Sequence, residues 1–163
     1  MRRLPVFVFL LATLTACGQS SGSGEGKQCP AMALMEGISL DVPPEAVAGI
    51  SRASMELCWG GKCVTEAVEL FPASKSEDQG CTSDEPDGVC SAQAVPTGGK
   101  YGSVPVQGLP FTPVKTTVTF DDGKPHVLDV TPVLAYPAGE ECGGGVPVAK
   151  LVVLPGGEVR QQR

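Results

Sequence analysis

The sequence has few of the side chains that most enzymes use. It contains one histidine, one tryptophan and two tyrosines among 163 residues. No Gly-x-Ser-x-Gly, His-Glu-x-x-His, phosphate-loop or dinucleotide-binding glycine pattern occurs. The histidine, His126, follows Pro125 in an expected strand, where a lone histidine is usually a surface or core-edge residue. We therefore expect no catalytic site, and a serine or zinc hydrolase is disfavoured.

The sequence also lacks a hydrophobic run long enough to span a membrane. The uncharged stretch Leu4 to Ala16 has thirteen residues, whereas a spanning helix needs roughly 20. Because Arg2 and Arg3 precede it, the segment has the layout of a secretory signal. Heptads, solenoid-length repeats and a three-residue glycine period are absent as well. With 21 glycines and 15 prolines, the chain is typical of a loop-rich, all-β domain.

A short motif ends the apolar run. Leu14, Thr15, Ala16 and Cys17 resemble the lipobox of bacterial lipoproteins. The resemblance implies that the Cys17 thiol carries diacylglycerol, that the chain is cut before Cys17 and that the new amino terminus is acylated. The alternative is an ordinary secreted protein cut at an Ala-x-Ala-like site. The seven cysteines favour the lipoprotein, because a lipidated Cys17 leaves an even number for disulfides.

This reading divides the chain into three parts. Residues 1–16 are the expected signal peptide, residues 17–28 the lipidated cysteine and a Gly/Ser-rich tether, and residues 29–163 the folded domain. Without Arg2 and Arg3, ten basic side chains face eighteen acidic ones, a net charge of −8. An acidic domain binds nucleic acid poorly. We expect a monomer anchored by lipid on the extracytoplasmic face of the cell membrane, without another cofactor.

The stretch CWGGKC, Cys58 to Cys63, predicts a tight hairpin. Gly60 and Gly61 suit a two-residue turn with positive φ at both positions, which places Cys58 opposite Cys63. At a non-hydrogen-bonded pair the Cα atoms lie about 4.5 Å apart, close enough for a disulfide. The extended register makes one face apolar except for Glu66, through the pairs Leu57 with Val64, Met55 with Glu66 and Ala53 with Val68. A disulfide is favoured over redox chemistry because no helix start lowers a thiol pKa here. Trp59 is expected at the edge of the core.

Further segments predict more strands. The first is Gly37 to Val42, and the last runs from Val146 to Leu154. Alternation from Val114 to Phe120, followed by a turn at Asp121 to Gly123, predicts a second hairpin with His126, Leu128 and Val130 on its apolar face. A short strand is expected near Val104 to Val106, and Ser74 to Gly102 as an irregular polar excursion. Seven such segments predict a single antiparallel β-sandwich, immunoglobulin-like or transthyretin-like.

The other cysteines fit a disulfide framework outside the cytosol. Cys81 and Cys90 flank a short loop within the polar excursion, so we predict a bond that closes it. Cys29 and Cys142 remain, and a sandwich of this kind brings the start of the first strand and the loop before the last to the same end. Their bond is predicted mainly by elimination, since six cysteines allow fifteen connectivities.

The polar excursion contains five acidic residues that could gather oxygens around calcium. They are Glu77, Asp78, Asp84, Glu85 and Asp87. The spacing of an EF-hand is missing, so a solvated acidic loop is favoured and no metal site is expected. Copper is disfavoured further, because the thiols should be oxidised.

As a whole the layout resembles small lipoproteins of high-GC Gram-positive bacteria, through the lipobox, the tether and the patterns LCWGGKC and VCSAQAVPTGG. The resemblance implies a cellular location and a fold but no activity. We expect a lipid-anchored binding module that recognises an envelope protein or glycan through loops at one end of the sandwich. Two alternatives are an enzyme acting on carbohydrate or peptidoglycan with two carboxylates in a cleft, and an accessory protein that binds a small solute or metal.

Overall fold

A computed structural model describes residues 29–83 and 88–162. The expected signal peptide, Cys17 and the tether lie outside the described residues, as do Asp84, Glu85 and Asp87. The chain falls into two units, residues 1–30 and 31–163, and the fold below is that of the second. No helix among the described residues is long and apolar enough to cross a membrane.

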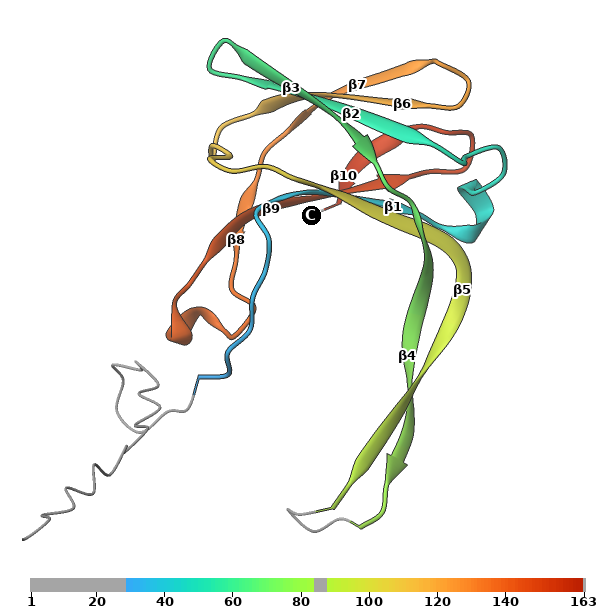
Figure 1. Ribbon diagram of the computed structural model, residues 1–163, viewed down its shortest axis with the longest axis vertical. Helices are drawn as coiled ribbons and strands as arrows, with labels where there is room; N and C mark the ends of the chain where they lie inside the picture. Colours follow the sequence, from blue (N-terminus) through green and yellow to red (C-terminus); the bar gives the residue numbers. More distant parts are fainter. Residues whose placement is uncertain (1–28, 84–87, 163) are drawn as a thin grey trace, which may run out of the picture. The chain divides into compact units, whose positions relative to one another are not determined.

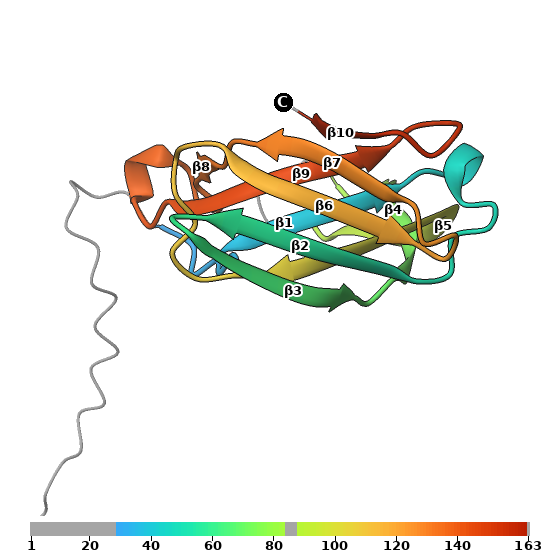
Figure 2. The ribbon, with the colours of Figure 1, turned by 90° about the horizontal axis from the view of Figure 1, so that it is seen from above.

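The second unit is all-β and consists of two sheets, as predicted (Figure 1). Six strands form one sheet in the order β10-β9-β1-β5-β4, with β8 also paired to β9, and four form the other in the order β3-β2-β6-β7. The strands are β1 Gly37–Val42, β2 Ala53–Trp59, β3 Lys62–Val68, β4 Phe71–Cys81, β5 Cys90–Pro105, β6 Val114–Phe120, β7 Pro125–Val130, β8 Val133–Ala135, β9 Val146–Val153 and β10 Val159–Gln162. Two short 3₁₀ helices, Pro44–Ala46 and Glu140–Cys142, lie in connections. Figure 2 looks onto the four-stranded sheet.

The six-stranded sheet is mixed rather than purely antiparallel. β1 pairs antiparallel with β5 but parallel with β9. The prediction of a wholly antiparallel sandwich was wrong on this point. The pairing joins strands about a hundred residues apart, and local alternation carries no information about the direction of so distant a partner.

Both predicted hairpins have the expected register. Cys58 lies opposite Cys63, and the outward pairs Leu57 with Val64, Met55 with Glu66 and Ala53 with Val68 follow. Gly60 and Gly61 have φ values of 56° and 78°, as the turn requires. In the second hairpin Val118 faces His126, and the Gly123 N–H donates to the Phe120 carbonyl at 3.0 Å. Turn chemistry and the apolar alternation of the strands together therefore predicted both registers.

The segment Ser74 to Gly102 was predicted as an irregular excursion, and this was wrong. It forms most of the hairpin β4–β5, whose strands have eleven and sixteen residues. The expected short strand near Val104 belongs to the end of β5. Most of this hairpin is exposed, so neither strand needs an apolar face, and the alternation that identifies a half-buried strand is missing.

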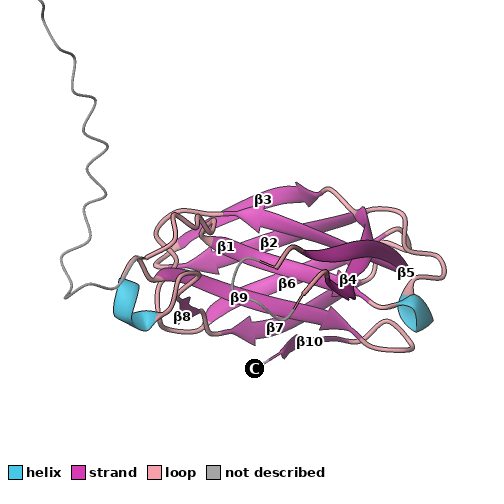
Figure 3. Cartoon of the chain, turned by 90° about the horizontal axis from the view of Figure 1, so that it is seen from below, coloured by secondary structure: helices cyan, strands magenta, loops and turns pink. Residues whose placement is uncertain are grey.

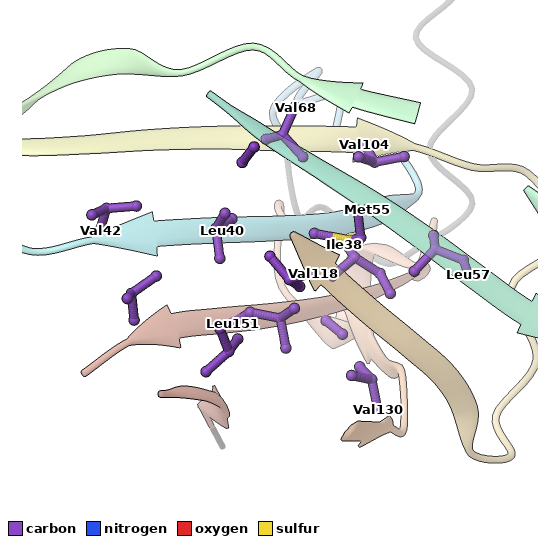
Figure 4. Packing of buried hydrophobic residues seen from close by; sticks show 14 of the residues in the cluster. Ile38, Leu40, Val42, Met55, Leu57, Val68, Val104, Val118, Val130 and Leu151 are labelled. Atoms are coloured by element: carbon purple, nitrogen blue, oxygen red, sulfur yellow. The ribbon is translucent and has the colours of Figure 1, made fainter. Parts of the chain in front are cut away.

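The core lies between the sheets and is built mainly from the inward-facing side chains of β1, β2, β5, β6 and β9, with Val68 of β3, Val130 of β7 and Val159 of β10 (Figure 4). Ile38, Leu40, Met55, Leu57 and Leu151 are fully buried, and Trp59 packs against their edge as predicted. Gly102 also faces inward, opposite Leu40. A Cβ there would lie 2.5 Å from the Glu69 carbonyl oxygen, so glycine lets the link between β3 and β4 cross close to the sheet.

Candidate functional site

Four cysteines of the second unit link paired strands. The structure contains the disulfides Cys58–Cys63, with Cα atoms 4.1 Å apart, and Cys81–Cys90, with Cα atoms 3.9 Å apart. Each joins two strands next to their turn. Cys29 and Cys142 each have a disulfide partner, and the pairing of the two with one another stays a prediction. Thiolate chemistry is therefore unavailable at Cys58 and Cys63.

The predicted metal and histidine candidates have structural surroundings. Asp78 accepts the Gly80 N–H at 2.7 Å, at an irregularity in β4. The one cluster of possible metal ligands among the described residues is Glu56 with Cys58 and Cys63, whose sulfurs are bonded to each other. His126 is partly buried and lies against Phe120, with ring centroids 5.4 Å apart. None of these arrangements brings together an acid, a base and a nucleophile.

A charged clamp joins the connection before β2 to the β6–β7 turn. Asp121 accepts the backbone N–H groups of Ser51 at 2.6 Å and Arg52 at 2.8 Å, and the Arg52 Nε at 3.2 Å. These hydrogen bonds, the one from the Arg52 backbone first, lower the pKa of Asp121 to about 2. A depression of about 600 Å³ adjoins the clamp. Because the Asp121 carboxylate already accepts hydrogen bonds from two backbone N–H groups, we assign the clamp a structural role.

The clamp predicts an acid dependence of stability. A carboxyl group whose pKa is lower in the folded chain stabilises it above its unfolded pKa, and this contribution disappears as the pH falls through the folded pKa. For Asp121 that window runs from about pH 4 to about pH 2. Asp121→Asn should therefore lower the melting temperature at neutral pH, and the difference from the parent should shrink across that window. Thermal melts at several pH values measure this. Asp129→Asn, on the exposed side of β7, is the matched control, and a pH-independent difference for Asp121→Asn would contradict the assignment.

The outer face of the six-stranded sheet presents a regular arrangement of surface side chains. The strand registers set these side chains in rows that cross β5, β1, β9 and the paired strand β8 or β10. Figure 3 shows the strands of this sheet. The rows are, in order, Pro105, Gly37, Val148 and Val133; then Ser103, Ser39, Lys150 and Gln162; then Tyr101, Asp41, Val152 and Arg160. An apolar row thus lies beside a polar one, about 14 Å across at the usual strand spacing.

Two depressions lie over the first two rows and share Val148 and Lys150. One, of about 330 Å³, is bounded by Leu34, Met35 and Pro105, with Ser39 and Ser103 beside them. The other, of about 590 Å³, extends toward Val133 and Gln162. Gly37 leaves this part of the sheet hollow, because its neighbours Pro105 and Val148 in the two adjoining strands are both larger. We name the two depressions together the outer-face groove.

Polar side chains of the groove make hydrogen bonds or ion pairs within the protein and still remain accessible to solvent. The Lys150 ammonium lies 3.5 Å from the Asp41 carboxylate, and the Lys150 side chain is 50% exposed. The Ser39 hydroxyl donates to the Ala149 carbonyl at 3.4 Å. Farther along the face, Phe71 and Tyr101 pack with ring centroids 5.8 Å apart and remain exposed. A cation, the carboxylates of Glu36 and Asp129, hydroxyls and apolar side chains therefore line the two depressions, and apolar walls with a few polar groups are the usual composition of a ligand site.

Comparisons with known proteins add no assignment. The chain matches no protein-family model, no curated protein and no solved structure. The candidate site consequently rests on the geometry of the outer-face groove alone.

Sequence reasoning placed recognition in loops at one end of the sandwich and missed this groove. The alternation of the last predicted strand already sets Val148 and Lys150 on its outer side. Their grouping with Ser39 and Pro105 depends on the parallel pairing of β1 with β9, and neither segment indicates that pairing by itself.

Proposed function

We propose that the protein is a binding module that the lipid on Cys17 anchors at the extracytoplasmic face of the cell membrane, and that it recognises an envelope component through the outer-face groove. The groove carries this proposal. Burying apolar surface favours association by about 25 cal/mol per Å², and the row containing Pro105, Val148 and Val133 offers such surface beside Lys150. The ligand is accordingly one with an apolar part and hydrogen-bonding groups along one side, because Glu36 and Asp129 also line the groove and Asp41 pairs with Lys150.

The lipid anchor and the folded domain have separate roles, membrane retention and ligand binding. The lipobox and the tether favour retention at the membrane, and the two disulfides suit an oxidising compartment. The β-sheet framework holds the groove side chains on rigid strands, which limits the entropy lost on binding.

A charge placed in the apolar row tests the groove. Val148→Lys should weaken binding about tenfold or more, because the new ammonium must lose its hydration when ligand covers it. Val127→Lys, on an exposed valine of the four-stranded sheet, is the matched control and should bind like the parent. The parent used in this comparison and both variants carry Cys17→Ser, so that retention on isolated envelope material reports binding by the domain and not by the lipid. Equal retention of the two variants, or no retention of the parent, would contradict the proposal.

A further inference from the structure

The hairpin β4–β5 extends beyond the sandwich as a two-stranded arm (Figure 1). β1 pairs with β5 only from Lys100 onward, and every residue of β4 from Ser74 to Cys81 is exposed. The disulfide Cys81–Cys90 closes the far end of the arm. A two-stranded ribbon alone is marginally stable in water, so the disulfide keeps ordered a structure that contributes little to the core.

The outer edge of β4 is open. Within residues 29–83 and 88–162, no strand pairs with this edge, and its backbone N–H and C=O groups form a row that another strand can extend. The register with β5 shifts between Pro72 and Ser74 and again between Asp78 and Gly80. Between these shifts lie five residues of regular strand, Ser74 to Asp78.

We propose that two copies of the chain form a dimer through antiparallel pairing of β4 with β4, about a two-fold axis that passes between the two Ser76 residues. The arms then form one four-stranded sheet. Ser76 is the middle residue of the regular stretch, so this register uses all of it. The dimer differs from the monomer expected from the sequence alone.

Charge selects this register. A two-fold axis normal to the sheet keeps each face on its own side, so residues on one face pair only with each other. Lys75 and Glu77 share a face and lie 2.8 Å apart within one chain. With the axis at Ser76, Lys75 of each copy faces Glu77 of the other. An axis at Lys75 or at Glu77 would instead set like charges opposite each other, which is destabilising.

The other edge of the arm suits pairing less well. The free part of β5 includes Pro96, which has no N–H to donate. Its stretch from Ser91 to Val95 has no charged side chain and so no means of selecting a register. The bulges that flank Ser74 to Asp78 also limit how far a strand of another protein could extend along β4.

Cysteine cross-linking tests the axis directly. In the dimer the two Ser76 Cα atoms lie about 4.5 to 5.5 Å apart, within disulfide range. Ser76→Cys in the full chain should therefore give a disulfide-linked dimer on non-reducing gels, both in membranes and after purification. Ser74→Cys is the matched control, because the two Ser74 Cα atoms would be offset by about 13 Å along the strands. A monomeric Ser76→Cys chain, or equal cross-linking of both variants, would overturn the proposal.

A charge swap tests the register without new thiols. Lys75→Glu should raise the dissociation constant of the dimer about tenfold or more, since it places like charges opposite each other twice. The double variant Lys75→Glu with Glu77→Lys should restore the parent value. Light scattering during size exclusion gives the mass of each variant. A parent monomeric at every concentration, or a dimer that Lys75→Glu leaves unchanged, would show that β4 does not pair in this way.

Discussion

A Cys17→Ser chain is expected in the soluble fraction, whereas the parent chain stays with the membrane. The change removes the thiol to which diacylglycerol would be joined. One acyl chain of the myristoyl kind gives an association constant of only about 10⁴ M⁻¹, and two or more give stable anchoring. The acidic domain adds no electrostatic attraction to an anionic bilayer. Loss of the lipid should therefore abolish attachment to the bilayer itself and leave only the weaker retention that the outer-face groove provides.

The measurement combines metabolic labelling with fractionation. In cells fed a clickable fatty acid, the parent chain should become labelled and the Cys17→Ser chain should not. Cys29→Ser is the matched control, because it removes a nearby cysteine that has a disulfide partner and should keep both the label and the membrane location. A parent chain without the fatty-acid label, or a Cys17→Ser chain that is still labelled, would refute lipidation at this residue.

Local chemistry predicted the hairpins because the information they need is local. Two adjacent glycines at 60 and 61 determine a turn, and the turn determines every pair along β2 and β3. The same holds for Gly123 between β6 and β7. The burial of Met55 and Leu57 followed from that register, so this part of the core was predictable as well.

The arm and the groove were not predictable for two different physical reasons. The arm has no buried face, so β4 shows no alternation of apolar and polar residues to distinguish it from a loop. The groove brings together Ser39, Ser103 and Lys150, which are far apart in the chain. Only the packing of the whole domain decides which strands become neighbours. The short strands β8 and β10 were missed because three or four residues are too few for a periodic signal.

Leu40→Ala is expected to lower the free energy of unfolding by about 3 to 5 kcal/mol, the upper part of the range for buried leucines. Leu40 is fully buried in β1, between Gly102 of β5 and Leu151 of β9. Gly102 has no side chain that could move into the cavity, and the backbone of Glu69 lies close to it.

Leu134→Ala, at a leucine that is 45% exposed, is the matched control and should lower the free energy by less than about 1 kcal/mol. Denaturant titration under oxidising conditions measures both variants, and a similar slope for the two indicates that the compactness of each state is unchanged. Because domains of this size have a total stability of about 5 to 15 kcal/mol, Leu40→Ala should bring the midpoint close to zero denaturant if the parent lies at the low end. An equal loss of unfolding free energy in the two variants would mean that β1 is not the centre of the core. In that case β1 would not hold Gly37 and Ser39 rigidly in the groove.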